Sequence, residues 1–241
     1  MSVSTRRWVV LVAALLTVAL TVRLGLWQLA RASQKEALQS MLERRAQLPE
    51  LHADELARTA AQAENQFYRH ARVEGRWLDR TVYLENRQMH GQPGFFVLTP
   101  LELSPHDVVL VQRGWAPRDP RDRTRVPTPP SPRGTIEISG VMASSPPKLY
   151  AFGPEAGGTL RQNLDLAEFA RETGLPLRPF TLLQTSDPQP PDGLLRDWPP
   201  PAINVQTHYG YAFQWFALAA LTLVLYAWFQ VVRPRIRRDA A

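Results

Sequence analysis

Two long apolar stretches lie at opposite ends of this 241-residue chain, and they constrain its fold more than any other feature. The first runs from Trp8 to Leu29 with Arg23 as its one formal charge, and the second, from Tyr209 to Val232, has none. As helices with a rise of about 1.5 Å per residue, both reach slightly beyond the roughly 30 Å hydrocarbon layer of a membrane. Each stretch therefore predicts a transmembrane helix.

Positive charge is concentrated outside the central segment. Residues 31–207 contain 21 basic and 21 acidic side chains, which cancel, so the net charge of +6 comes from the two ends and Arg23. Short segments on the cytoplasmic side of a membrane span collect Lys and Arg. Arg6 and Arg7 precede the first stretch and four arginines follow the second, so we expect both termini in the cytoplasm of a bacterium and the central domain in its periplasm. A nucleic-acid partner would require a basic patch on the folded domain and is not expected.

The first stretch has a second interpretation, a cleaved signal peptide, because Ala30-Arg31-Ala32 resembles a small-x-small cleavage site. Its span length and the helix-forming residues that continue beyond it favour a retained helix. The chain contains no cysteine, which excludes thiol-based copper chaperones, zinc ribbons and attached c-type haem proteins. We predict a multi-pass protein of the inner membrane in five parts: a cytoplasmic tail (1–7), a transmembrane helix (8–29), a periplasmic domain (30–208), a second transmembrane helix (209–232) and a cytoplasmic tail (233–241).

The periplasmic domain is predicted to be mainly β-structure. After the first span, helix formers continue to Pro49, and a short helix is predicted from Asp54 as N-cap to about Ala63. A further helix is predicted with Asn163 as N-cap and Gly174 after its end. Six segments rich in β-branched and aromatic residues predict strands, and we expect antiparallel pairing because no helix intervenes between the first five: FYRHARVEGRWL, TVYLENR, GFFVLTPLEL, DVVLVQRGW, TIEISGVM and RPFTLLQTS. The predicted fold class is thus a membrane α+β protein, two transmembrane helices flanking a mainly antiparallel-β domain with a few short helices.

Two proline-rich stretches, 116–133 and 186–201, are predicted to be extended loops. The arginines of the first suit either an anionic partner or a solvated insertion, and the second interpretation is favoured.

No nucleophile, metal or nucleotide motif is present, and His52, His70, His90 and His106 have no partner at metal-ligand spacing. We therefore do not expect an enzyme.

Polar and aromatic residues gather where each apolar stretch meets the periplasm. In the first span Arg23, Trp27 and Arg31 follow at intervals of four, and Gln28 lies three residues before Arg31. These residues are either an aromatic and basic anchor at the membrane interface or one wall of a site. Arg23 lies near enough to the outer end for its side chain to reach the interface.

The second span carries a similar set of side chains. On a helical wheel His208 and Trp215 share one face, with Tyr211 and Gln214 on the adjoining arc, and Gln214 is expected to find a partner on the first span. Phe213, Phe216 and Tyr209 occupy an arc suited to lipid. A neutral imidazole is a good axial ligand for haem iron, aromatic rings can flank a porphyrin, and arginines can pair with its propionates. His208 is otherwise a simple interfacial residue, and spacing alone does not decide between the two.

Several patches, in this order along the chain, resemble the surfeit-locus family of cytochrome c oxidase biogenesis factors. The patches are LGLWQLARASQK, VEGRW, YLENR, GQPGFFVLTPLEL, VVLVQRGWAP, TIEISGVM and HYGYAFQWFALA. The family's first motif falls on Gly25, Trp27, Gln28, Arg31 and Lys35. Its strand-turn motif falls on Arg113, Gly114, Trp115 and Pro117, and its second-span motif on His208, Tyr211, Trp215 and Phe216. Gln112 and the spacing of Asn204 from His208 depart from the family pattern.

The resemblance implies a membrane protein that assists maturation of the haem-copper oxidase, by delivering or inserting haem a into its catalytic subunit, without turnover of its own. His208 is then the expected haem ligand, with Tyr211, Trp215, Trp27, Gln28, Arg31 and Arg23 as further cofactor-binding residues. Expected partners are the oxidase catalytic subunit and other assembly factors. The alternatives are a haem-free membrane scaffold that recruits these partners and an enzyme acting on haem or lipid, for which no catalytic constellation is visible.

Overall fold

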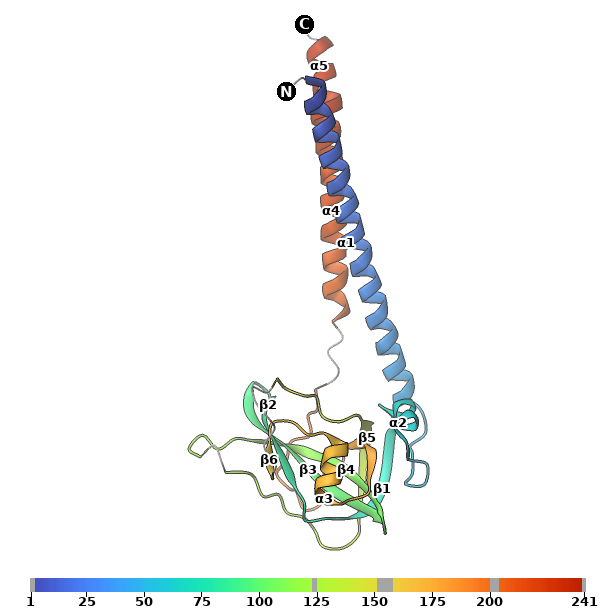
Figure 1. The fold of residues 1–241 in the computed structure, drawn as a ribbon, viewed down its shortest axis with the longest axis vertical. Coiled ribbons are helices and arrows are strands. Elements are labelled where there is room, and N and C mark those ends of the chain that lie inside the picture. The colour runs from blue at the N-terminus through green and yellow to red at the C-terminus, as the bar shows by residue number, and fades with distance from the viewer. Residues whose placement is uncertain (1–2, 123–124, 151–157, 200–203, 240–241) are drawn as a thin grey trace. The chain divides into compact units, whose positions relative to one another are not determined.

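The computed structural model of the protein describes residues 3–122, 125–150, 158–199 and 204–239. The chain divides into two compact units, one of residues 1–41 and 201–241 and the other of residues 42–200. The first unit is made of long helices and the second is rich in β-structure (Figure 1).

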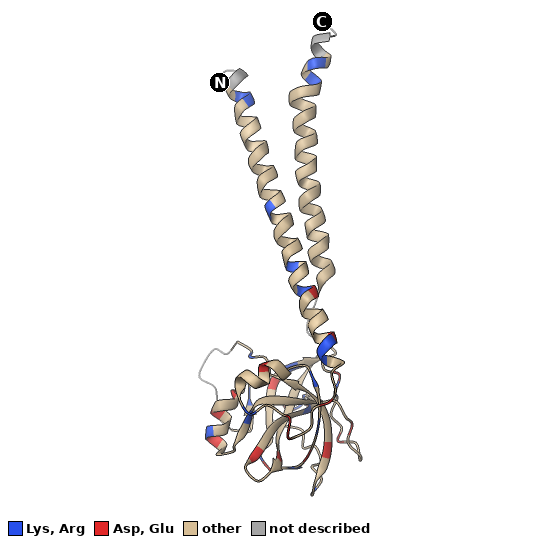
Figure 2. Cartoon of the chain, turned by 90° about the vertical axis from the view of Figure 1, so that its right-hand side faces the viewer, with Lys and Arg blue, Asp and Glu red and all other residues tan. Residues whose placement is uncertain are grey.

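The helical unit contains α4 (Val205–Ala227) and all of α1 (Val3–Ala46) except its last five residues. The second helix continues through a π-helical turn, η1 (Trp228–Val232), into α5 (Arg233–Asp239). At 44 residues α1 is about 66 Å long, roughly twice the hydrocarbon layer, so its polar half extends beyond any span. Basic residues lie near the N-terminal end of α1 and in α5 (Figure 2).

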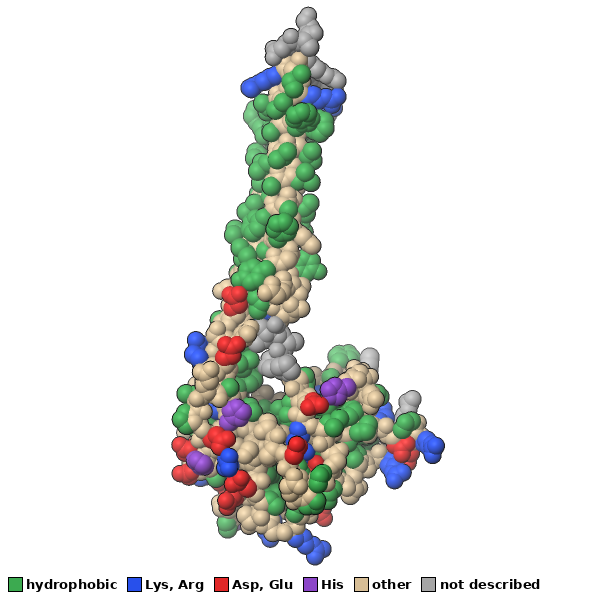
Figure 3. Space-filling view, turned by 180° about the vertical axis from the view of Figure 1, so that it is seen from behind, with side chains coloured by type: hydrophobic (Ala, Val, Ile, Leu, Met, Phe, Trp, Pro, Cys, Tyr) green, Lys and Arg blue, Asp and Glu red, His purple; other side chains and the backbone are tan. Residues whose placement is uncertain are grey.

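Both helices are long and apolar enough to cross a membrane. The candidate spans Thr5–Ala46 and Val205–Ile236 have mean hydropathies of 2.4 and 1.8, yet only 11% and 6% of their apolar windows are buried. A core helix of a water-soluble protein would be mostly buried, whereas here hydrophobic side chains line the surface of the helices (Figure 3). These surfaces require an apolar environment, so the protein is membrane-associated, and the predicted fold class is confirmed.

The second unit is a seven-stranded sheet in the order β1-β5-β7-β4-β3-β2-β6. A short additional pairing, Trp77 with Leu101, joins β1 to β3 and closes the first five strands of that order into a ring. The strands are β1 (His70–Trp77), β2 (Val82–Met89), β3 (Gln92–Ser104), β4 (Asp107–Pro117), β5 (Ile136–Ala143), β6 (Leu160–Arg161) and β7 (Leu177–Gln184).

The pairings among the first five strands are antiparallel, as predicted, and two parallel pairs join later strands to them. Strands β4 and β7 pair in parallel, for example Leu110 with Thr181, and so do β2 and β6. The chain between β4 and β7 includes α3 (Leu166–Thr173), which provides the long connection that a parallel pair requires. The remaining pairing, β5 with β7, is antiparallel.

The caps of the two short helices differ from those predicted. The helix α2 (Ala60–Gln66) begins after Thr59, which forms a capping box with Gln62, rather than after Asp54. The helix α3 is capped by Asp165, whose carboxylate accepts two backbone N–H bonds and whose pKa these bonds and Lys148 hold below its usual range. The predicted cap Asn163 is instead buried and bonds to the backbone of Leu149. Gly174 ends α3 in the left-handed region, as predicted.

The interior of the ring is apolar, because alternate residues of each strand point inward. Its main cluster joins five strands to the segment before β1, and its members include Leu51, Leu56, Val73, Leu101, Val109, Val111, Ile138, Met142, Phe180 and Leu182. A second cluster packs Phe169 of α3 against Leu84, Leu98 and Leu110. The proline-rich stretches are not wholly loops, because Pro117 belongs to β4 and Leu195 bridges to Trp115.

Candidate functional site

The candidate site lies where α1 and α4 face each other near the start of α4. The least exposed residues of α1 here are Thr21, Gly25, Gln28 and Ala32, and those of α4 are His208, Ala212, Trp215, Phe216 and Ala219. Each set repeats every three or four residues, which places it on one face of its helix. Small residues on both faces let the two backbones approach closely, as in other membrane helix pairs.

Gly25 is required at this contact. A Cβ atom built there would lie 2.7 Å from one atom of the Phe216 ring and 2.8 Å from another, distances that real side chains do not show. Phe216 therefore packs on α1 and does not face lipid, contrary to the sequence-based expectation. On the helical wheel Phe216 borders the arc of Ala212 and Ala219. These two residues are small, so α1 can approach closely enough to contact Phe216 as well.

The polar contact of the site joins His208 to Gln28. The Nδ1 atom of His208 lies 2.7 Å from Oε1 of Gln28, and both side chains are half-buried. At the next residue the Tyr209 hydroxyl donates to Oε1 of Glu36 at 2.9 Å. Tyr209 thus also contacts α1, so its predicted place on the lipid arc is wrong. Phe213 is 74% exposed, in agreement with a lipid-facing position.

Three predicted residues of α1 lie away from this contact. Trp27 is 51% exposed, and Arg23 and Arg31 are exposed as well. The Arg31 guanidinium lies 5.8 Å from the Trp27 ring centroid and donates to Gln34. The structure therefore separates the arginine and tryptophan stripe from Gln28, although the sequence predicts one wall for all four residues.

The predicted residues of α4 are also divided. Trp215 is half-buried on the face that carries His208, whereas Tyr211 is 48% exposed. Gln214 lies on the exposed side of α4, so the expectation that it bonds to the first span is wrong. Of the seven proposed cofactor-binding residues, the structure brings Gln28, His208 and Trp215 to the facing surfaces of the helix pair. Across the ranges that the structure describes, no three His, Asp or Glu side chains are grouped as a metal site.

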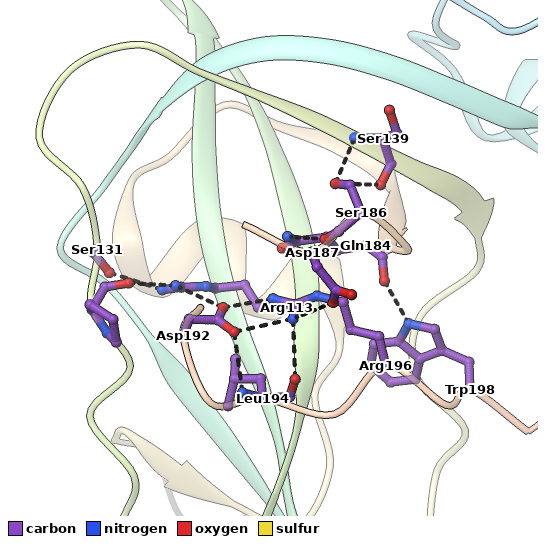
Figure 4. Close-up of polar contacts among 11 residues, drawn as sticks. Arg113, Ser131, Ser139, Gln184, Ser186, Asp187, Asp192, Leu194, Arg196 and Trp198 are labelled. Atoms are coloured by element: carbon purple, nitrogen blue, oxygen red, sulfur yellow. Dashed lines mark hydrogen bonds and ion pairs between the residues drawn. The ribbon is translucent and has the colours of Figure 1, made fainter. Parts of the chain in front are cut away.

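A second polar cluster lies in the β-rich unit, around the strand-turn motif of β4 (Figure 4). The Arg113 side chain is 2% exposed and lies over the Trp77 ring, 4.7 Å from its centroid. It donates to Ser131 Oγ at 2.9 Å and to the Pro130 carbonyl at 2.8 Å, and it lies 3.4 Å from Asp192. Burial lowers the pKa of Arg113, and the charge of Asp192 opposes that change.

Asp192 holds two arginines at once. Its Oδ2 atom also accepts a 2.6 Å bond from Arg196, which reaches the exposed Asp187 at 3.3 Å. The neighbouring Gly114 leaves room for this segment, because a Cβ there would lie 2.7 Å from the Leu194 side chain. The Trp115 indole donates to the Arg87 carbonyl at 2.9 Å. Asp192, and Leu195 through two backbone hydrogen bonds with Trp115, fasten this segment to β4, so the motif stabilises the fold.

Comparisons with known proteins agree on one family. The model of the SURF1 family matches residues 15–220 of the chain. A SURF1-like protein of Rickettsia bellii (strain RML369-C) is 28% identical, over 93% of this chain and 95% of the relative. SURF1-like proteins of Rickettsia felis and Rickettsia conorii are each 25% identical over 88% of this chain.

Proposed function

The chain belongs to the SURF1 family, the surfeit-locus family that its motifs resemble, and from this membership we propose that it is an assembly factor for haem-copper cytochrome c oxidase. It acts without catalytic turnover, by assisting delivery or insertion of haem a into the catalytic subunit. The two spans cross the bacterial inner membrane with both termini in the cytoplasm, and the β-rich unit lies in the periplasm. That unit engages the oxidase subunit or other assembly factors.

The observation that carries the haem proposal is the placement of His208 on the face of α4 that packs against α1. The residues present fit a haem iron, because His208 uses Nδ1 for Gln28 and no described residue bonds its Nε2 atom. A neutral imidazole nitrogen of this kind is a haem ligand. When bound, haem would offer its iron for ligation and its porphyrin surface for contact with side chains. Trp215 and the exposed Tyr211 would border the porphyrin, whereas Trp27, Arg23 and Arg31, on a separate face of α1, could meet only its outer edge and propionates.

A carrier must shield its cargo and then release it. A single histidine ligand suits this task better than a site closed by two histidines, because only one bond to the protein must be exchanged on transfer. His208 is the one histidine of the helical unit, and the other four belong to the β-rich unit. We therefore propose transient binding of haem a at the helix pair.

The proposal is tested by the optical spectrum of the full chain, purified in detergent from cells that make haem a. We expect a haem signal in the wild type and its loss in His208→Ala, with His90→Ala as a matched control that keeps the signal. His90 is a suitable control because it pairs with Asp197 in the β-rich unit. A wild type without haem, or a His208→Ala protein with the wild-type signal, would contradict the ligand assignment.

A second candidate is the haem-free scaffold, which one observation favours. Arg23, Trp27 and Arg31 form an exposed stripe on α1, and such a stripe suits a partner in the membrane as well as a cofactor. Both candidates predict an oxidase-poor membrane after deletion of the gene. Full rescue by His208→Ala would support the scaffold, whereas failure of that variant to rescue would support the haem carrier.

A further inference from the structure

The hydrogen bond between His208 and Gln28 has a defined direction. Oε1 of Gln28 is an amide oxygen, which carries lone pairs and no hydrogen. At 2.7 Å from that oxygen, Nδ1 of His208 must be the donor, so Nδ1 carries the ring hydrogen of the neutral imidazole. The hydrogen bond thus leaves Nε2 with its lone pair.

The neighbours of Gln28 hold it in register with His208. One turn before it, Gly25 receives the Phe216 ring, and one turn after it Ala32 is fully buried. The bond from Tyr209 to Glu36 fixes a second point of the same contact, eight residues along α1. Sliding or rotating one helix against the other would break these contacts together. The half-buried position also limits competition from water for the His208 bond.

We propose that Gln28 is a positioning residue, which selects the Nδ1–H tautomer of His208 and so presents Nε2 as the nitrogen that binds iron. This inference rests on the proposed haem function and adds the ligand atom and the residue that selects it. A hydrogen bond from the second ring nitrogen of a metal-binding histidine fixes its tautomer and orientation and raises its basicity. Loss of such a partner costs about 10–100-fold in metal affinity.

The tautomer is measured without haem, so that this inference and the proposed function are tested separately. The full chain, labelled with ¹⁵N-histidine, is studied by NMR in detergent at pH 8, and His208→Gln identifies the His208 signals among the five histidines. We expect a protonated Nδ1 and an unprotonated Nε2. A protonated Nε2 in the wild type would mean that the Gln28 amide is reversed, which would overturn the inference.

Three variants test the role of Gln28 with ferric protoporphyrin IX (haemin) as the probe. Gln28→Leu removes the acceptor, and we expect the Nδ1–H preference to be lost and haemin affinity to fall about 10–100-fold. Gln28→Glu retains an acceptor oxygen and should keep the Nδ1–H tautomer, with affinity near that of the wild type. Gln206→Leu, at an exposed glutamine of α4, should change neither measurement.

The outcomes separate the two hypotheses. Wild-type haemin affinity in Gln28→Leu, together with loss of binding in His208→Ala, would overturn the positioning role and leave the haem function standing. A wild type that shows the Nδ1–H tautomer but binds no haemin would uphold the tautomer assignment and overturn the haem function. Equal losses in Gln28→Leu and Gln28→Glu would also overturn the inference, because acceptor chemistry would then not matter.

Discussion

The missing side chain of Gly25 allows the Phe216 ring to lie against α1. Gly25→Ala would force a methyl group to within 3.0 Å of that ring, and overpacking of this kind typically costs about 1–3 kcal/mol. We expect a lower thermal unfolding midpoint of the full chain in detergent, and recovery in the double variant Gly25→Ala/Phe216→Leu. Gly210→Ala is the matched control, because a Cβ there meets nothing within 4 Å. An unchanged midpoint in Gly25→Ala would contradict the packing.

The buried side chains of Arg113 and Arg196 share Asp192 as an ion-pair partner. Asp192→Asn leaves both guanidinium groups without that countercharge, and breaking a buried pair costs about 3–5 kcal/mol. We expect a matching loss in the free energy of unfolding of the β-rich unit, followed by tryptophan fluorescence in urea. Asp187→Asn removes the exposed partner of the same Arg196, so it should change stability by less than about 1 kcal/mol. Similar losses in the two variants would argue against a buried network.

The Arg178 side chain connects the segment before β1 to strands β4 and β7. Arg178 of β7 donates two 2.6 Å bonds to Asp107 of β4, and it also donates to the carbonyls of Ala53, Leu56 and Ala57. A single guanidinium therefore joins two strands and a turn. The hydrogen bonds from Arg178 hold the pKa of Asp107 below its usual range, although partial burial opposes them.

The ion pair between Arg178 and Asp107 predicts acid sensitivity. Because the pKa of Asp107 is lower in the folded state, its contribution to stability is complete above the unfolded pKa of about 3.9 and is lost as pH falls through the folded value. The free energy of unfolding should therefore decline below about pH 4, and Asp107→Asn should reduce that decline while lowering stability at pH 7 by about 1.5–3 kcal/mol. Urea titrations at pH 7, 4 and 3 measure both effects. An Asp107→Asn protein with the wild-type slope would contradict the assignment.

The local structure of the β-rich unit could be predicted from the sequence better than its pairing. Strand segments follow from β-branched and aromatic runs between turn residues, and β1 to β5 lie where those runs predict them. The parallel pair of β4 and β7 could not be predicted, because it depends on contacts between segments about 70 residues apart, as in Gln112 with Leu183. The Thr59–Gln62 capping box was visible in the sequence and would have located α2 correctly.

The helix pair shows the same limit. Periodicity placed His208 and Trp215 on one face of α4, and the structure agrees. Periodicity alone could not say which arc of α1 meets that face, since Trp27 and Arg31 carry a stronger aromatic and polar signal than Gln28 and Gly25. The deciding property is size, because the close approach of the helices needs Gly25 and Ala32 at the contact. Small residues at intervals of seven, here Gly25 and Ala32, were the signal that would have found it.

The proposed membrane topology rests on the arrangement of charge over the whole chain. The central segment is neutral and the basic residues lie at the two ends, so the proposed orientation keeps both termini in the cytoplasm. Because the chain has no cysteine, single cysteines can report on each side without a modified background. Lys148→Cys, at a side chain that is 62% exposed, should react with a membrane-impermeant maleimide in cells whose outer membrane is permeabilised.

Ala241→Cys should react with the same reagent only after the inner membrane is opened. The distinction has a physical basis, because carrying the four C-terminal arginines across the bilayer would cost several kcal/mol and would oppose the charge rule. The reverse pattern, with Ala241→Cys labelled and Lys148→Cys protected, would place the His208 end of the helix pair at the cytoplasmic face. The helix contact would survive that result, but delivery of haem from the periplasmic side of the membrane would not.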